Sequence, residues 1–161
     1  MTPFCFEHVF RAESSDAIMA SFFDDEHQAE QDRALDILER TVLERGDGRR
    51  VCRVVPNRKI PLIGGTFHYV ESVTRSGDAE LAIDILPSLS RMAITATYRL
   101  DPVGARAIRR RYAGAVSVNI ALIGGRLERG AVEELGRSLP RAAACTQAWL
   151  DRIPRYMCRP A

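Results

Sequence analysis

The side chains that could take part in ligand chemistry lie on segments whose sequence alternates as in a β-strand. Tyr98 and Tyr112 share the phase of the apolar residues around them, so their hydroxyls could point into one site. Tyr69 and Glu71 lie two residues apart on another such segment. Arg110 has the phase of Tyr112, and its guanidinium could bind a carboxylate or a phosphate. The pattern favours a simpler interpretation, in which the tyrosines are core aromatics and Arg110 lies at an exposed strand end.

Enzymatic chemistry in such a site would need an acid or a base. The candidates are Tyr98, Tyr112, Glu71 and His68. The G-x-S-x-G motif of a serine nucleophile is absent, and no histidine has a recognisable nucleophile motif beside it. We therefore assign no catalytic residue and expect a protein that is not an enzyme.

Metal, nucleotide and nucleic-acid sites are not indicated. The segment Asp24–His27 with Glu30 lacks the spacing of a calcium loop and has no His-x-x-x-His pair. The glycine pairs Gly64-Gly65 and Gly124-Gly125 match neither phosphate-binding pattern. Arginines 109–111 would project to alternating faces of a strand instead of forming one basic patch. We expect no cofactor, no metal ion and no nucleic-acid partner.

The elements that must position the candidate residues are mostly strands. Gly46-Asp47-Gly48 is a strong hairpin signal, and Asn57–Gly65 reads as a loop or a bent strand extension. Asp101–Gly104 reads as a further turn. The predicted strands are Phe4–Ala12, Asp36–Glu44, Arg49–Pro56, Thr66–Arg75, Ala79–Leu86, Arg91–Leu100 and a last strand from about Ala107, whose apolar alternation continues to Leu122.

Helical periodicity occurs in three places. Two short helices are predicted after the first strand, one capped by Ser14 or Ser15 and one over Asp24–Arg33. A long helix of about residues 124–153 follows the last strand. Its apolar stripe consists of Leu127, Ala131, Leu135, Leu139, Ala142 and Leu150, with Ile123, Val132 and Trp149 beside them.

The order of these elements predicts an α+β fold. Consecutive strands joined by short turns form an antiparallel sheet, here of about seven strands. The first strand is separated from the others by the short helices and should pair with the last. The long helix needs a broad curved sheet to lie against.

The C-terminal segment resembles a known group of domains. Val116–Leu150 contains the alternating strand, Gly124-Gly125, Glu128, Glu134-Leu135 and Trp149-Leu150. In these positions it is similar to a bacterial family of domains of unknown function in the START-like (SRPBCC) helix-grip superfamily. The resemblance extends more weakly along residues 1–161, which we interpret as one START-like domain. It implies a curved antiparallel sheet wrapped around the long C-terminal helix.

The resemblance also implies an elongated apolar pocket between sheet and helix. Composition alone favours a filled core instead. A pocket would bind a lipid, sterol, quinone or polyketide-like molecule, and the protein would be its carrier. Two alternatives stay open: a polyketide cyclase/aromatase-like enzyme that uses the pocket tyrosines, and an interaction module with a filled core. The expected pocket residues are Phe67, Tyr69, Ile83, Met92, Ile94, Tyr98, Arg110, Tyr112, Val116, Val118, Leu127, Ala131 and Leu135.

Composition limits the remaining possibilities. The 161 residues have a net charge of +2, but residues 1–48 carry −8 and residues 49–161 carry +10. We expect the two halves to pair across the fold, although a basic face could also make transient contact with an anionic membrane surface. Cys5, Cys52, Cys145 and Cys158 are scattered, and the N-terminus lacks a secretory signal, so we expect a cytoplasmic protein with reduced thiols. The ligand and the oligomeric state cannot be read from these patterns.

Overall fold

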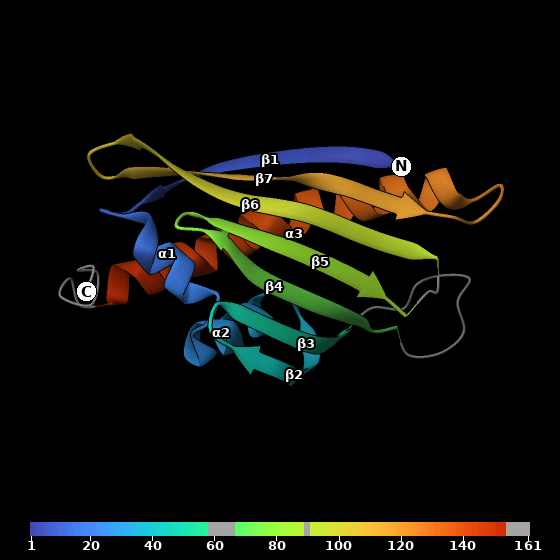
Figure 1. Ribbon diagram of the computed structural model, residues 1–161, viewed down its shortest axis with the longest axis horizontal. Coiled ribbons are helices and arrows are strands. Elements are labelled where there is room, and N and C mark those ends of the chain that lie inside the picture. Colours follow the sequence, from blue (N-terminus) through green and yellow to red (C-terminus); the bar gives the residue numbers. More distant parts are fainter. Residues whose placement is uncertain (58–66, 89–90, 154–161) are drawn as a thin grey trace.

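The protein has the α+β helix-grip architecture that the element order predicts. The computed structural model describes residues 1–57, 67–88 and 91–153. Figure 1 shows one twisted sheet with the long C-terminal helix across one of its faces. The elements in chain order are β1 (Thr2–Arg11), α1 (Ser15–Ser21), α2 (Asp25–Ala34), β2 (Ile37–Gly46), β3 (Arg49–Pro56), β4 (Tyr69–Gly77), β5 (Glu80–Pro87), β6 (Met92–Gly104), β7 (Ala107–Val118) and α3 (Gly124–Arg152).

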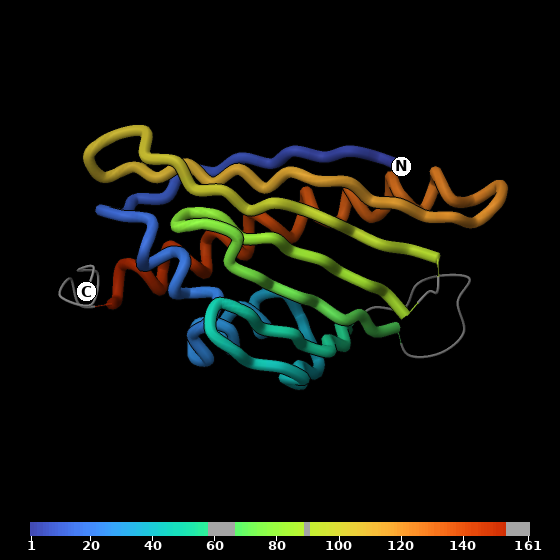
Figure 2. Tube along the Cα trace, in the orientation of Figure 1, coloured from blue at the N-terminus to red at the C-terminus, as the bar shows by residue number. Residues whose placement is uncertain are grey.

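The sheet is antiparallel throughout, and its strand order is β1-β7-β6-β5-β4-β3-β2. The first strand pairs with the last, as the sequence predicts, so β1 and β7 lie side by side (Figure 2). The β2–β3 turn falls at Asp47-Gly48, where Gly48 has a φ of 68° that favours glycine. Most of the predicted loop at Asn57–Gly65, including Gly64-Gly65, lies outside the described residues.

One face of the sheet, which we call the concave face, carries the core. Directly opposed residues on neighbouring strands point to the same side, so one row across β4, β5, β6, β7 and β1 can be followed through the register. That row consists of Val73, Ile83, Ala96, Gly114 and Phe4. The apolar phase of the predicted strands is therefore the phase that faces α3.

The helix α3 packs mainly on β1, β7 and α2. Its apolar stripe contributes Leu127, Ala131, Leu135, Leu139 and Leu150 to the core cluster, as expected. Although α3 has 29 residues, no helix within the described ranges is long and apolar enough to cross a membrane.

The junction between β7 and α3 differs from the prediction. The apolar alternation continues to Leu122, but β7 ends at Val118, and Leu122 and Ile123 are exposed. At this end of β7 the backbone N–H of Val118 donates to Glu128 Oε1 at 2.9 Å, which ties the strand to α3. A Cβ on Gly124 would lie 2.6 Å from the carbonyl oxygen of Val118, so glycine permits this close approach.

The predicted turn at Asp101–Gly104 is also wrong, since β6 continues to Gly104 and the turn falls at residues 105–106. Proline cannot donate to a sheet ladder and is tolerated at irregularities. Here Pro102 lies opposite Ile108, next to a register shift between Pro102 and Gly104. The bulge lets the hairpin extend past the proline.

Candidate functional site

The residues expected to line a pocket lie together on the concave face and on the α3 stripe that faces it. Opposed pairs are Tyr98 with Tyr112, Ile94 with Val116, and Met92 with Val118, and Ile83 is opposite Ala96. Leu127, Ala131 and Leu135 pack against the same core from α3. Phe67 lies just before β4, with its ring 6.3 Å from that of Tyr69. The strand and helix phases thus bring the predicted set to one region.

Burial divides this set into two groups. The buried residues are on the central and β7 side of the sheet, and they are Ile83, Ile94, Tyr98, Arg110, Tyr112, Val116 and Val118. The half-buried residues are at the start of β4 and β6 and on the first half of α3, and they are Phe67, Tyr69, Met92, Leu127, Ala131 and Leu135. The half-buried group keeps part of its surface exposed.

Aromatic rings that the expected pocket set does not include fill the concave face near β1. Phe4 contacts both Phe6 and Tyr112, with ring centroids 5.8 and 5.5 Å apart. Phe22, which follows α1, meets the ring of Tyr98 edge-on at 4.7 Å. The apolar alternation of the first strand could have indicated that Phe4 points toward the concave face. Nothing in the local sequence places Phe22 against Tyr98.

Two tyrosine hydroxyls in this region have no hydrogen-bond partner among the described residues, those of Tyr69 and Tyr112. Burial, followed by the nearby charge of Glu71, raises the pKa of both phenols well above the usual value. Both side chains therefore remain protonated at neutral pH. They are available to donate to an acceptor in the interior.

Arg110 is inside the protein, which corrects the favoured interpretation of an exposed strand end. Only 3% of the residue is exposed, and its guanidinium carbon lies 5.9 Å from the ring centroids of Phe10 and Tyr98. Burial lowers the pKa of Arg110, while the Tyr98 hydroxyl next to it acts in the opposite direction. Burial raises the pKa of Tyr98, and Arg110 counteracts this. The inward phase shared with Tyr112 decides the direction of this side chain.

Glu71 belongs to an ionic cluster at the other end of the concave face, where α2 covers β2–β4. Its Oε1 accepts from Arg40 Nη1 at 2.8 Å. Arg40 Nε also lies 3.0 Å from both carboxylate oxygens of Asp32 on α2. Gln28 donates to Asp32 Oδ1 at 3.2 Å, and its own Oε1 accepts from Arg50 Nη2 at 2.6 Å. Sequence reasoning missed this cluster apart from Glu71.

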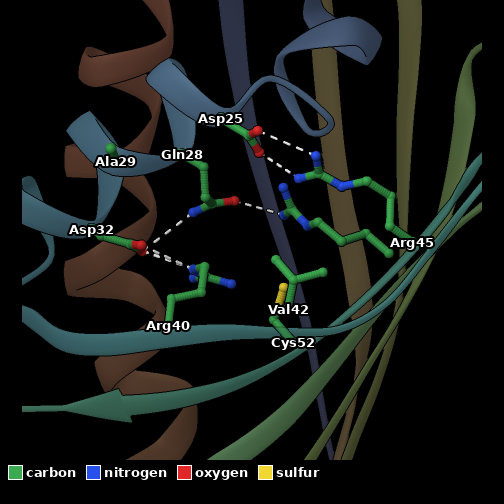
Figure 3. Close-up of a pocket in the computed structure, with 9 residues that line it drawn as sticks. Asp25, Gln28, Ala29, Asp32, Arg40, Val42, Arg45 and Cys52 are labelled. Carbon is green, nitrogen blue, oxygen red and sulfur yellow. Dashed lines mark hydrogen bonds and ion pairs between the residues drawn. The ribbon is translucent and has the colours of Figure 1, made fainter.

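Two hollows lie at the margins of the concave face. One, of about 180 Å³, lies between α2 and the β2–β3 hairpin, and Figure 3 shows the acidic and amide side chains of α2 pointing toward the arginines of the strands. The other, of about 200 Å³, lies among the end of β1, α1 and the end of α3. None of the expected pocket residues lines either hollow.

The acidic segment that begins α2 has structural partners. Asp24 caps the helix by accepting the His27 N–H at 2.8 Å, and Asp25 pairs with Arg45. Glu30 pairs with Arg152 at 2.6 Å. His27 is buried, and its Nε2 lies 3.0 Å from Thr146 Oγ1 on α3. Burial lowers the pKa of His27, so it is neutral in this helix–helix contact.

Glu128 joins three segments of the chain. Besides the Val118 amide, it accepts from Thr2 Oγ1 at 2.8 Å, and the amino group of Met1 lies 3.1 Å away. These donors lower the pKa of Glu128 to about 2. The contacts favour the structural role over ligand contact for this residue.

Acidic residues of the first 48 positions pair with later arginines, as the charge asymmetry predicts. Examples are Glu13 with Arg106 at 3.9 Å and Glu39 with Arg53 at 3.6 Å. Glu30 with Arg152 is the same kind of pair. The two charged halves therefore compensate each other across the fold.

Comparison with solved structures supports the fold assignment. A START superfamily protein from Mycobacterium smegmatis is similar with a TM-score of 0.65 and 12% identity, covering 96% of this chain and 100% of that one. The aromatase/cyclase Zhui from Streptomyces sp. R1128 gives 0.66 and 11%, covering 93% and 94%. Norcoclaurine synthase from Thalictrum flavum, in complex with dopamine and hydroxybenzaldehyde, gives 0.68 and 12%, covering 95% and 88%.

Comparison with sequences identifies the family. No curated protein matches this chain. The model of a family described as protein of unknown function (DUF2505) matches residues 13–150. The chain therefore belongs to the DUF2505 family and has the START-like helix-grip fold.

Proposed function

We propose that this protein binds a hydrophobic small molecule between the concave face and the first half of α3, and that it acts as a carrier for it. The observation that supports this most directly is the combination of half-buried apolar side chains with tyrosine hydroxyls that have no partner among the described residues. Met92, Leu127 and Leu135 belong to the apolar group, and Tyr69 and Tyr112 supply the hydroxyls. Neither hydroxyl is among the buried unpaired atoms of the described residues, so both retain accessible surface through which a ligand or water can reach them.

The apolar surface supplies the affinity in this proposal. Removing apolar surface from water is worth roughly 25 cal/mol per Å². A lipid-, sterol-, quinone- or polyketide-like molecule offers enough such surface for binding. The fold relatives include an aromatase/cyclase and a synthase in complex with two aromatic molecules, which agrees with an organic ligand in this fold.

Binding is better supported than base catalysis. The candidate bases are Tyr98, Tyr112, Glu71 and His68. Because burial raises the pKa of Tyr98 and Tyr112, neither is a phenolate at neutral pH. Glu71 is held in an ion pair with Arg40. These observations support hydroxyls that orient a ligand, and they favour the carrier over the cyclase-like alternative.

The test combines native mass spectrometry of freshly purified protein with titration of an apolar fluorescent probe, 1-N-phenylnaphthylamine. We expect a co-purified apolar ligand and saturable probe binding. Ala131 lies on the face of α3 that packs on the core, so Ala131→Trp should fill the site and weaken probe binding about tenfold or more.

Ala144→Trp is the matched control, because Ala144 is an exposed residue of the same helix. It should leave probe affinity unchanged within about twofold. Absence of both co-purified ligand and saturable binding would rule out the carrier and favour an interaction module with a filled core. Equal loss in both variants would place the probe elsewhere.

A further inference from the structure

We propose that the hollow between α2 and the β2–β3 hairpin is a binding site for a small oxyanion, a carboxylate or phosphate group, held by Arg50. The hollow has about 180 Å³ and is lined by Asp25, Gln28, Ala29, Asp32, Arg40, Val42, Arg45, Arg50 and Cys52. The site is separate from the expected hydrophobic site, because the two share no lining residue. It therefore does not depend on the proposed function.

Among the arginines around the hollow, Arg50 has the weakest contact with a carboxylate. Asp32 is engaged by Arg40 Nε, and Asp25 by Arg45. Glu71, just outside the lining, accepts from Arg40 at 2.8 Å but lies 3.9 Å from Arg50. With Glu71 included, three arginines face three carboxylates, and Arg50 is the arginine whose ion pair is longest.

Arg50 is also short of hydrogen-bond partners. The residue is 2% exposed, and its Nη2 donates to the neutral Oε1 of Gln28 at 2.6 Å. Its Nε and Nη1 are buried and have no partner among the described residues. Buried N–H groups without an acceptor are costly, and a guanidinium that lines a hollow can recover that cost by binding an oxyanion.

Its neighbours hold Arg50 in place for this role. Opposed residues place it beside Arg45 on β2 and Val73 on β4, and Gln28 fixes it from α2. Figure 3 shows the Arg45 side chain reaching Asp25 at the rim. The volume accommodates about six water molecules at roughly 30 Å³ each, which is enough for an oxyanion but not for a long hydrocarbon chain.

The experiment is an NMR titration of the full chain that follows backbone amides and arginine Nε–H signals at constant ionic strength. The probes are inorganic phosphate, acetate and octanoate. We expect a saturable shift of the Arg50 Nε–H signal with at least one of them. Arg50→Met should weaken that binding by about tenfold to a hundredfold, since a charge-assisted hydrogen bond is lost. Octanoate binding about tenfold tighter than acetate would identify the anion as the headgroup of a hydrophobic ligand, whereas similar affinities would identify a free anion.

Two further variants keep the test decisive. Arg53→Gln is the matched control on the same strand, because the Arg53 side chain is 41% exposed and pairs with Glu39. The affinity of this variant for the anion should stay within about twofold of that of the unmodified protein. Ala29→Leu narrows the hollow and retains every charge, so it should also weaken binding even if Arg50→Met does not fold. The proposal is overturned if no probe gives a saturable shift, if Ala29→Leu binds normally, or if Arg53→Gln loses as much affinity as Arg50→Met.

Discussion

The two ends of the concave face are built from different chemistry. At the β1–β7 end, rings and aliphatic side chains such as Phe4, Tyr112 and Val116 pack under α3. At the β2–β3 end, α2 covers charged and amide groups such as Arg40 and Arg50, which pair with Asp32 and Gln28. Both ends belong to one seven-stranded sheet.

The two ends should therefore respond differently to substitution in their free energy of unfolding. Apolar packing is non-directional, and its loss at one position is partly absorbed by neighbours. A buried ion pair is directional, and removal of one partner leaves an uncompensated charge. Single substitutions at the ionic end should therefore lower the free energy of unfolding more than the volume of the removed side chain suggests.

The largest loss in the free energy of unfolding is expected for Arg40→Met. Arg40 has 12% side-chain exposure and pairs with Asp32 and Glu71, which have 17% and 19%. Removal of the guanidinium leaves two largely buried carboxylates without their shortest ion-pair partner, at a cost of about 3–5 kcal/mol. Urea unfolding followed by circular dichroism measures it. A loss below about 1 kcal/mol would mean that the ionic end does not depend on this pair.

The second-largest loss of stability is expected for Gly114→Ala at the apolar end. A Cβ on Gly114 would lie 2.1 Å from the Thr95 carbonyl oxygen and 2.7 Å from Ala96 Cα, so β6 and β7 must separate. We expect a loss of about 1–3 kcal/mol in the same measurement. Gly130→Ala is the matched control in α3, where nothing lies within 4 Å of the new Cβ, and it should stabilise by roughly 0.5–1 kcal/mol. A neutral Gly114→Ala would show that the strands can move apart freely.

A smaller and pH-dependent effect is expected for Glu128→Gln. The pKa of Glu128 is about 2 in the folded protein and 4.5 ordinarily, so its carboxylate contributes stability above about pH 4.5, and this contribution is lost as the pH falls through about 2. The variant should be less stable than the unmodified protein at pH 7, and the gap should narrow between pH 4.5 and 2. Urea midpoints at several pH values measure this gap. A gap that is constant over that range would exclude Glu128 as the titrating group.

The smallest effect is expected for Arg53→Gln. The ion pair of Arg53 with Glu39 is 3.6 Å long, and the side chains are 41% and 59% exposed. Exposed pairs contribute about 0–1 kcal/mol, and salt screens them. Urea unfolding at low and high salt tests this. A loss comparable to that of Arg40→Met would remove the distinction between surface and covered pairs.

The apolar end could be predicted from the sequence to a large extent. The alternation of Ile94, Tyr98 and Tyr112 gave the correct concave phase, and the stripe of α3 gave its partner. The end of β7 could not be predicted, because the apolar alternation continues to Leu122 although the strand ends at Val118. The inward direction of Arg110 agreed with its strand phase, although a charged residue near a strand end normally favours the surface.

The sequence by itself determined the α+β element order, the antiparallel sheet with β1 beside β7, and the apolar faces, because periods of two and 3.6 residues are local properties of the chain. Only the tertiary structure decided which charges meet under α2. Arg50 and Gln28 are 22 residues apart and Arg40 and Glu71 are 31 apart, and no local period relates them. Their contacts follow from where α2 lies on the sheet, and so do the unpaired Arg50 N–H groups that the oxyanion would bind.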